Sequence, residues 1–312
     1  MLMMKMYNIG KDTDMNVSEK DNNIYITQIS DFNVEQTLEC GQCFHFKKLG
    51  ENEYALAAFG KLLHIMQEED RIILFDTDMK DYNNIWKKYF DLGRDYKHIK
   101  EYILKNDKRL KEAVETMGGV RILNQDFFET LISFIISQNK QIPHIKKIVF
   151  DISKRYGRYL GSINGEEFYS FPDVEAMKNV TEAQLRECKT GFRAPYIADA
   201  VKKVASGEIR KDRLLQADIK ECEKMLMSIK GVGTKVANCV MLFSLGKTDA
   251  FPVDVWIKRI MEYIYFDGAD TKKEIIEQFA RKHFGEYGGF AQQYLFYYAK
   301  TMKIGTDTSV PK

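Results

Sequence analysis

The sequence predicts an α+β protein in which an antiparallel β-sheet region precedes a longer helical region. Short apolar runs separated by turn-forming residues fill the first part of the chain. After Asp78 the apolar residues recur at helical spacing, and this period dominates to the end. No proline precedes Pro143, and the later prolines stand near helix starts or inter-helix turns. The length of 312 residues fits one large domain or two ordinary ones.

The β region is predicted from Ile24 to about Thr77, as an antiparallel meander with one covered face. Its apolar runs are residues 24–26, 43–46, 54–59, 62–66 and 72–75, and its turn candidates are 50–52, 60–61 and 68–70.

The domain division follows from polarity and glycine. Residues 1–22 are polar and lack periodicity, so we expect a disordered leader there. Gly118-Gly119 is the best internal boundary. It separates an N-terminal antiparallel β domain with flanking helices, residues 23–118, from an all-helical domain, residues 119–312.

The charge balance excludes a globally polycationic protein. Lys and Arg number 47 against 45 Asp and Glu, a net charge of +2, so any nucleic-acid contact must use a local basic face. Residues 139–158 predict such a stripe, although a solvated helix face is the alternative for its far end. The stripe contains Lys140, Lys146, Lys147, Lys154, Arg155 and Arg158, with Asp151 as its acid.

Other compositional features argue against secretion, membranes and metals. No apolar run approaches the ~18 residues that span a bilayer, and the start lacks the apolar stretch of a signal peptide. Five cysteines, an odd number at low density, fit a reducing interior. Neither H-E-x-x-H nor a pair of Cys-x-x-Cys runs occurs, so a zinc ion has no ligand set and we expect no metal and no cofactor. We therefore expect an intracellular protein, in the cytoplasm or nucleoid if the source is prokaryotic.

The most informative stretch is residues 222–246. Two apolar helices are predicted there, joined by the turn Gly231-Val232-Gly233. The backbone N–H groups of such a turn point outward at a helix N-terminus, where the dipole and the free donors favour a phosphate. An ordinary tight turn between helices is the alternative.

Lys235 and Asp254 add chemistry to this hairpin. Lys235 stands in the first turn of the second helix, where the helix dipole disfavours a cation and so favours the neutral, nucleophilic amine. A surface lysine on a phosphate is the alternative. Asp254 precedes an apolar helix and is a good N-cap, and it is also a candidate carboxylate facing Lys235.

These residues resemble a known family. The run K-G-V-G-T-K-V-A, followed nineteen residues after the lysine by P-V-D, resembles the helix-hairpin-helix Gly/Pro-Asp superfamily of DNA glycosylases. Further matches resemble its branch of 8-oxoguanine DNA glycosylases with lyase activity. These are C-G-Q-C-F at 40–44, S-Q-N at 137–139, G-F-R at 191–193 and the stretch 291–296.

The resemblance implies the reaction and its partner. Lys235 matches the lysine that attacks the sugar C1′, forms a Schiff base and allows β-elimination. Asp254 matches the aspartate that stabilises the oxocarbenium-like charge. The implied partner is duplex DNA containing 8-oxoguanine, preferably opposite cytosine, with the base flipped out of the helix. We expect a monomer.

Four residues match the pocket for the flipped base. Gly41 matches the residue whose backbone carbonyl accepts from N7–H, which 8-oxoguanine has and guanine lacks. Cys239 and Phe296 match the two faces that sandwich the base, and Gln292 matches the amide that reads its pairing edge. The alternatives are a turn or bulge for Gly41, helix core for Cys239 and Phe296, and an exposed helix position for Gln292.

Asn139, Arg193 and Phe192 match residues that fill the gap, grip the orphaned cytosine and wedge the kink. The second cytosine-reading arginine of the family falls at His144, which offers fewer donors, so we expect a weaker preference for cytosine. A phosphate-contacting histidine of the family falls at Trp256, which puts that contact in doubt.

Three other functions are alternatives to excision of 8-oxoguanine. Thiol–disulfide exchange at Cys40-x-x-Cys43 needs the first cysteine at a helix N-terminus, whereas strand-like residues follow it. A non-catalytic damaged-DNA-binding module needs neither Lys235 nor Asp254. A glycosylase for another damaged base is the third; iron–sulfur members need four C-terminal cysteines, and none lies beyond Cys239, while alkylbase members generally lack the lysine.

Overall fold

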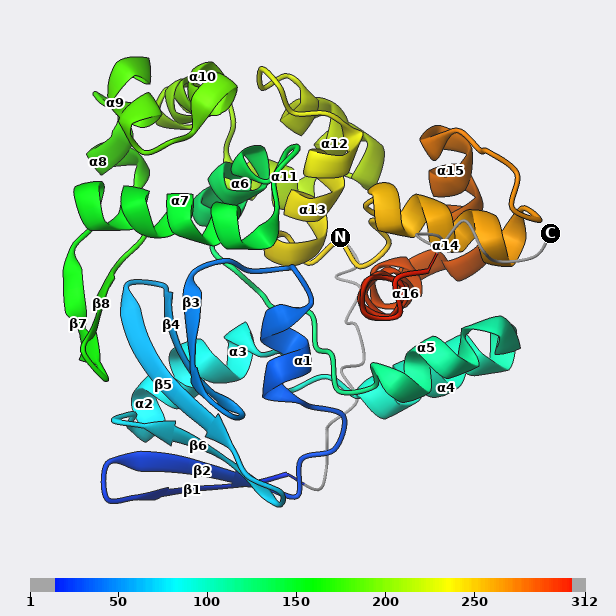
Figure 1. The fold of residues 1–312 in the computed structure, drawn as a ribbon, viewed down its shortest axis with the longest axis horizontal. Helices are drawn as coiled ribbons and strands as arrows, with labels where there is room; N and C mark the ends of the chain where they lie inside the picture. The colour runs from blue at the N-terminus through cyan, green and yellow to red at the C-terminus, as the bar shows by residue number, and fades with distance from the viewer. Residues whose placement is uncertain (1–14, 305–312) are drawn as a thin grey trace, which may run out of the picture.

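A computed structural model describes residues 15–304, which form a sheet region beneath a helical region (Figure 1). Six strands make one antiparallel sheet in the order β1-β2-β6-β5-β4-β3, so the α+β class is confirmed. The strands are β1 (Asn16–Lys20), β2 (Asn23–Thr27), β3 (Phe46–Gly50), β4 (Glu53–Ala58), β5 (Lys61–Gln67) and β6 (Arg71–Phe75).

The meander predicted from Ile24 to about Thr77 is confirmed for β3–β6, which are neighbours in sequence order in the sheet. Its first run, 24–26, lies in β2, which pairs with β6 and not with β3. Tight turns join β3–β6 where expected; at the β4–β5 turn Phe59 and Gly60 take positive φ of 51° and 72°. Two further details differ from the prediction. Strand β1 lies within residues 1–22, which were expected to be disordered, and it pairs with the apolar β2 that follows them. Residues 1–14 lie outside the described residues. The run 43–46 becomes strand only at Phe46.

Helix α1 (Val34–Glu39) was not predicted, because it is short and its apolar residues make no extended periodic pattern. The Asn33 side chain caps it by accepting a hydrogen bond from the Gln36 amide at 2.7 Å. Val34 and Leu38 are fully buried in the sheet core. The helix ends at Cys40 and so delivers the Gly41 loop to the junction with the helical region.

The first helical segment after the sheet also packs on the sheet core. It consists of α2 (Met79–Asp81), a π-helical turn (Tyr82–Trp86) and α3 (Lys87–Tyr89). Tyr82, Trp86 and Tyr89 are buried in the same cluster as the strand residues. The helical spacing predicted after Asp78 is therefore present here.

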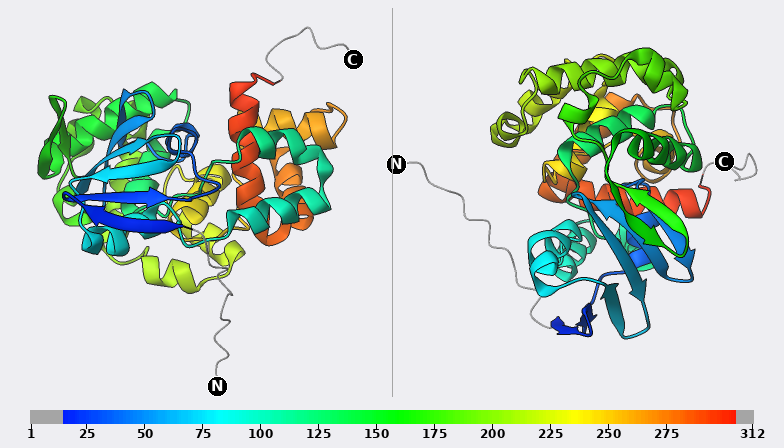
Figure 2. Two further views of the ribbon diagram at one scale, coloured as in Figure 1. Left: turned by 90° about the horizontal axis from the view of Figure 1, so that it is seen from below. Right: turned by 90° about the vertical axis from the view of Figure 1, so that its left-hand side faces the viewer.

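The boundary predicted at Gly118-Gly119 does not separate two bodies. Helices α4 (Tyr96–Asn106) and α5 (Lys111–Thr116) precede it, yet they pack with the C-terminal helices, away from the sheet (Figure 2). Gly119 itself packs on the start of α1, where an added Cβ would lie 2.4 Å from the Cβ of Asn33. The sequence pattern located a glycine-rich turn but could not show which core the preceding helices join.

Eleven helices follow residue 119 in the described chain. They are α6 (Phe127–Ile136), α7 (Ile142–Tyr156), α8 (Val174–Met177), α9 (Glu182–Glu187), α10 (Ala194–Ala205), α11 (Lys211–Gln216), α12 (Ile219–Met227), α13 (Thr234–Ser244), α14 (Val255–Tyr265), α15 (Lys273–Phe284) and α16 (Gly288–Thr301).

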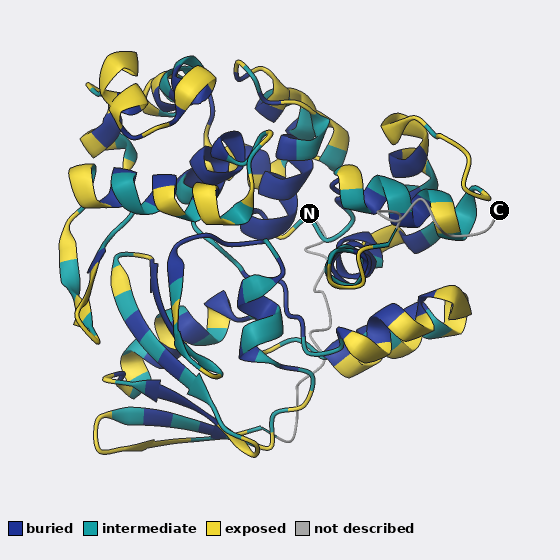
Figure 3. Ribbon diagram, in the orientation of Figure 1, coloured by how far each residue is buried: buried dark blue, intermediate teal, exposed yellow. Residues whose placement is uncertain are grey.

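One departure from the expected all-helical domain is the hairpin β7 (Tyr159–Ile163) and β8 (Glu166–Tyr169), which packs beside the main sheet. Helices α6 and α13 form the centre of the helical region and are almost entirely buried (Figure 3). Across residues 15–304, no helix has the length and apolarity to cross a bilayer.

Candidate active site

The hairpin between α12 and α13 has the predicted form. Gly231 takes a φ of +76°, and an added Cβ there would lie 2.3 Å from the Tyr196 ring, so both the conformation and the space require glycine. Gly233 is the N-cap of α13 and has nothing within 4 Å of an added Cβ, so this end of the helix is open. Val232 differs from the prediction of a phosphate donor, because its N–H already donates to the Ile229 carbonyl at 3.0 Å.

Lys235 extends from the first turn of α13 toward α6. Its Nζ lies 3.3 Å from the Ser137 hydroxyl oxygen and 5.0 Å from the centre of the Phe134 ring. Within residues 15–304, no carboxylate forms an ion pair with this amine. Local sequence does not place Ser137 and Phe134 beside the lysine, because only the packing of α6 on α13 brings them there.

Asp254 is the N-cap of α14, as its position after Pro252 predicted. Its Oδ1 accepts a hydrogen bond from the Ile257 amide at 2.8 Å. Burial raises the pKa of this carboxyl, an effect that the Ile257 hydrogen bond and the charge of Lys235 oppose. The cap and the candidate catalytic carboxylate are thus one group, held beside the lysine by the start of a helix.

A cavity of about 60 Å³ lies between these two side chains and the N-terminal region. It brings together both predicted catalytic residues and all four predicted base-binding residues. Gly41 enters it from the loop after α1 with a φ of +80°, and an added Cβ there would lie 3.1 Å from the Phe296 ring. The lining residues are Gly41, Phe134, Lys235, Cys239, Phe243, Pro252, Asp254, Gln292, Gln293 and Phe296.

Gln292 carries the most informative polar atom of the cavity. It is buried, not exposed, and its Nε2 donates to the Pro252 carbonyl at 3.3 Å. Its Oε1 is buried without a hydrogen-bond partner among the described residues. An unpaired buried acceptor is costly, and a ligand donor would relieve that cost.

Cys239 lies on the same helix face as Lys235, one turn along, and is buried. Burial raises the pKa of its thiol to about 11, so the sulfur is neutral at physiological pH. The side chain therefore offers a soft, uncharged surface and not a reactive thiolate.

None of the four residues predicted for the opposite strand lines the cavity. The Arg193 guanidinium is buried and donates to the Gln138 carbonyl, which places it next to Asn139. Phe192 is 53% exposed, and Asn139 is exposed with a φ of +51°. His144 lies exposed in the first turn of α7.

Comparison with known proteins agrees with this geometry. A family model described as 8-oxoguanine DNA glycosylase, N-terminal domain, matches residues 24–131, and one described as HhH-GPD superfamily base excision DNA repair protein matches residues 132–284. The chain belongs to the 8-oxoguanine DNA glycosylase family.

Similar proteins cover most of its length. The Clostridium acetobutylicum 8-oxoguanine glycosylase/lyase, in complex with duplex DNA containing cytosine opposite 8-oxoG, is 38% identical with a TM-score of 0.89 over 93% of this chain and 100% of that chain. MBOgg1, in complex with a low affinity DNA ligand, is 43% identical with a TM-score of 0.89 over 93% and 99%. N-glycosylase/DNA lyase OGG1 of Arabidopsis thaliana is 32% identical over 83% of this chain and 75% of that protein.

The basic stripe predicted over residues 139–158 is smaller in the structure, because several of its basic side chains are engaged within the protein. Lys154 pairs with Glu167 at 2.8 Å, and Arg155 pairs with Glu187. Lys146 is packed over Phe46, with its Nζ 3.5 Å from the ring centre, and burial lowers its pKa. Arg158 donates to the Gly60 carbonyl at 3.4 Å, while Lys140 is half-buried and Lys147 is exposed.

Trp256, the position at which the family resemblance implies a histidine, lies half-buried in the first turn of α14. The Arg259 guanidinium carbon lies 5.4 Å from the centre of its ring. An arginine one turn along the helix thus stands beside the position at which the family's phosphate contact was expected.

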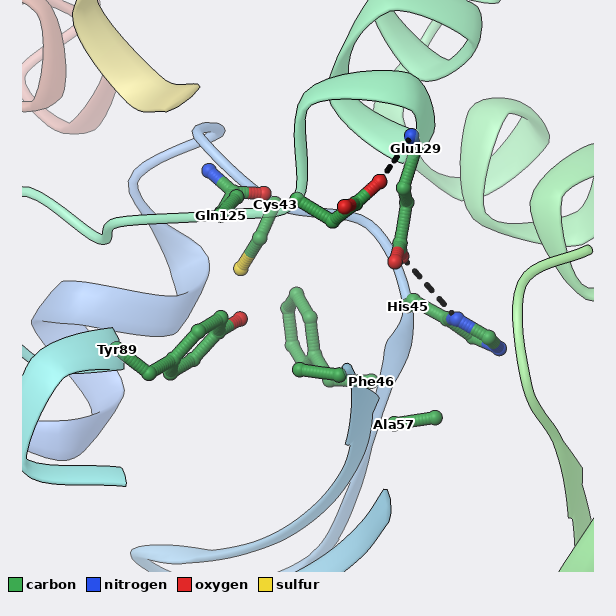
Figure 4. Close-up of a pocket in the computed structure, with 9 residues that line it drawn as sticks. Cys43, His45, Phe46, Ala57, Tyr89, Gln125 and Glu129 are labelled. Carbon is green, nitrogen blue, oxygen red and sulfur yellow. Dashed lines mark hydrogen bonds and ion pairs between the residues drawn. The ribbon is translucent and has the colours of Figure 1, made fainter. Parts of the chain in front are cut away.

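A second cavity, of about 10 Å³, lies between β4 and α6 (Figure 4). The His45 Nδ1 and the Glu129 Oε1 are 3.2 Å apart there, and the His45 ring packs edge-on against Phe150. This space is about the size of one water. The contacts join the sheet to the helical region, and the cavity is a packing gap and not a second substrate site.

Proposed function

We propose that this protein excises 8-oxoguanine from duplex DNA and then cleaves the strand at the resulting abasic site. The observation that carries the proposal is the convergence of Lys235, Asp254 and Gly41 on one cavity. An amine without a carboxylate ion pair is free to act as a nucleophile, and a neighbouring carboxylate can stabilise positive charge on a sugar.

The reaction follows from these groups. The Lys235 amine nitrogen forms a bond to C1′ as the glycosidic bond breaks; the base departs with the bonding electrons and takes up a proton released from that nitrogen. Asp254 stabilises the positive charge that develops on the sugar ring. The C1′–O4′ bond then breaks, its electrons go to O4′, which takes a proton from solvent, and the nitrogen lone pair completes the Schiff base. Removal of a C2′ proton by a base then expels the 3′ phosphate by β-elimination. Ser137 holds the amine near this path through its hydroxyl.

Recognition of the base uses the walls of the cavity. The Gly41 carbonyl accepts from N7–H of 8-oxoguanine and faces the lone pair of a normal guanine, which disfavours it by ~1–3 kcal/mol. Cys239 and Phe296 cover the two faces of the base. The unpaired Gln292 Oε1 accepts from the N–H groups on its pairing edge.

The remaining predicted residues contact the duplex. The open N-terminus of α13 at Gly231 and Gly233 binds a backbone phosphate. Phe192 wedges the kink while Arg193 and Asn139 occupy the space of the flipped base. Because His144 supplies fewer donors than arginine, the preference for cytosine is weak; comparable excision opposite cytosine and adenine supports this, and strong cytosine selectivity contradicts it.

The proposed active form is a monomer inside the cell. The six lining residues with proposed roles all come from one chain, so a monomer suffices for activity. Because the proposed substrate is duplex DNA, the protein acts inside the cell, in the cytoplasm or nucleoid if the source is prokaryotic.

Borohydride trapping tests the proposal. The protein is incubated with a duplex holding one 8-oxoguanine opposite cytosine, reduced, and examined for a covalent protein–DNA band, with Lys235→Gln and an undamaged duplex as controls. A band that needs both the lesion and Lys235 supports the nucleophile and the substrate together. No band despite lesion-specific binding contradicts the lyase mechanism, and release of the free base then separates a monofunctional glycosylase from a damage-binding module.

A further inference from the structure

Asn238 is a fully buried amide in the middle of α13, three residues after Lys235. An amide in such a place is costly unless its polar atoms are paired. Its Nδ2 donates toward the Thr234 carbonyl at 2.9 Å and toward the Glu223 and Glu277 carboxylates at 3.2 Å each. Its Oδ1 accepts from the backbone N–H of Phe251 at 3.1 Å.

These partners fix the orientation of the amide. A backbone N–H only donates, so the oxygen of Asn238 must face Phe251. A carbonyl and two carboxylates accept, so the nitrogen must face the opposite side. Among side chains of this size, leucine fulfils neither requirement and aspartate only the first.

The acceptor side of Asn238 holds the segment that carries Asp254. Phe251 lies three residues before Asp254, and its N–H is bonded to the Asn238 Oδ1. The next residue, Pro252, accepts through its carbonyl from Gln292, and Asp254 then begins α14. The bond from Asn238 is the direct polar link from the helix of Lys235 to the segment of Asp254.

The donor side of Asn238 is anchored on α12 and α15. Glu223 and Glu277 share one guanidinium, with the Arg281 Nη2 at 3.1 Å and 2.5 Å from their oxygens. The acidic pair therefore has a fixed place, and the amide that spans it is fixed as well. Four segments of the chain meet at this one side chain.

We propose that Asn238 is a positioning residue, which sets the placement of the Asp254 carboxylate relative to the Lys235 amine for base excision. The inference rests on the proposed function, since it concerns the rate of that reaction. Loss of the Asn238 link frees the segment of Asp254, and a displacement of about 1 Å at a reacting group lowers the rate on the order of 100-fold.

The first test compares Asn238→Leu with Leu63→Ala. Leu63 is fully buried in β5, in the sheet core, so its truncation lowers stability away from the cavity. We measure thermal stability, affinity for a duplex holding a tetrahydrofuran abasic analogue, and single-turnover excision of 8-oxoguanine with enzyme in excess. Asn238→Leu should lose about 100-fold in excision while its abasic-duplex affinity stays within about threefold, and Leu63→Ala should lose stability alone.

The second test is a rescue. Asn238→Asp keeps the acceptor for Phe251 but adds a third carboxylate beside Glu223 and Glu277, so excision falls. Adding Glu277→Gln restores a donor for the new carboxylate, and its amide oxygen still accepts from Arg281. The double variant should excise 8-oxoguanine at least tenfold faster than Asn238→Asp does. A purely structural defect at either residue would not allow this recovery.

The outcomes separate this inference from the proposed function. Excision at the wild-type rate by folded Asn238→Leu, or an equal loss of excision and abasic-duplex affinity, overturns the positioning role. If Asn238→Leu does not fold, the rescue decides: recovery supports the role, and no difference between Asn238→Asp and the double variant overturns it. Absence of excision by the wild-type protein instead contradicts the proposed function.

Discussion

Two carboxylates, the half-buried Asp254 in the cavity and the buried Asp107 beyond the C-terminal end of α4, are held in opposite ways. Asp107 accepts from the Arg109 Nε and Nη2 at 2.9 and 2.8 Å, from the Tyr265 hydroxyl at 2.9 Å and from the His283 ring at 2.7 Å. Burial alone would raise the pKa of Asp107, but these hydrogen bonds outweigh it and hold the pKa well below the ordinary value.

Asp254 has a raised pKa because its burial is compensated less completely, by its helix-cap bonds and by the charge of Lys235. The cavity repeats this pattern at Gln292, whose Oε1 has no partner in the described chain. The comparison separates a structural cluster, in which each charge is matched within the protein, from a site whose polar groups are left for a substrate. The cavity contributes less to stability than the Asp107 cluster does, because the cavity keeps polar groups without partners in the protein.

Asp254→Asn should give the largest effect. Asparagine is an equally good N-cap, so α14 still begins there, but the charge that we propose stabilises the sugar is lost. We expect single-turnover excision to fall about 100- to 1,000-fold, measured at saturating enzyme. Excision within a few-fold of wild type would remove Asp254 from the reaction.

The same variant tests the sign of the Asp254 pKa. Because the folded-state pKa of this carboxyl is raised, its ionisation opposes folding, and that cost develops as pH rises through the folded pKa. Asp254→Asn should therefore be more stable than wild type at neutral pH, and the difference should vanish in acid. Denaturant unfolding at several pH values measures it, and a less stable variant at neutral pH would contradict the contrast with Asp107.

Asp107→Asn should act on stability and not on catalysis. It weakens hydrogen bonds that join α4 to α14 and α15, and we expect a loss of about 2 kcal/mol at neutral pH. Excision per folded molecule should stay within twofold of wild type. A selective loss of excision in a stable variant would show that the cluster is coupled to the site.

The stabilisation by Asp107 should also depend on pH. Its folded pKa is lowered, so its contribution is fully present above the unfolded pKa of ~3.9 and is lost as pH falls through the folded value. The gap in unfolding free energy between wild type and Asp107→Asn should therefore narrow below about pH 4. A gap that is constant between pH 7 and pH 3 would mean that the ionic hydrogen bonds contribute little.

Gln292→Leu should give the smallest effect. Replacing the unpaired acceptor removes a buried cost, so stability should be unchanged or higher by about 1 kcal/mol. Excision of 8-oxoguanine should fall roughly tenfold, the equivalent of one hydrogen bond to the base. A clear loss of stability with normal excision would show that the bond to Pro252 is the residue's main role.

The sequence predicted those parts of the site that depend on local chain chemistry. Glycines at 231 and 233 between two apolar runs predict the hairpin, because a left-handed turn and a close approach to Tyr196 require glycine. Asp254 was predicted as an N-cap from its neighbours alone. Gly41, Cys239, Gln292 and Phe296 were named only through the family resemblance, and the cavity contains all four.

The remaining differences arise from contacts between distant segments. The Val232 amide is not a free phosphate donor, because it already donates to a carbonyl within its turn. Lys146 is not part of the open basic face, because it packs over an aromatic ring. Residues 16–20 form a strand, because they pair with the neighbouring β2. The role of Asn238 is hidden from the local sequence for the same reason. Three of its partners, Glu223, Phe251 and Glu277, lie 13 to 39 residues away along the chain.

The sequence by itself determined the α+β order, the hairpin, the lysine in the first turn of its second helix and the aspartate that caps the following helix, because helix caps, glycine turns and apolar periods act over a few residues. Only the tertiary structure decided that α4 and α5 join the helical core, that the Gly41 loop closes the cavity, and which polar groups remain unpaired. Burial and pairing are properties of the packed chain, and they set the charge states on which the chemistry depends.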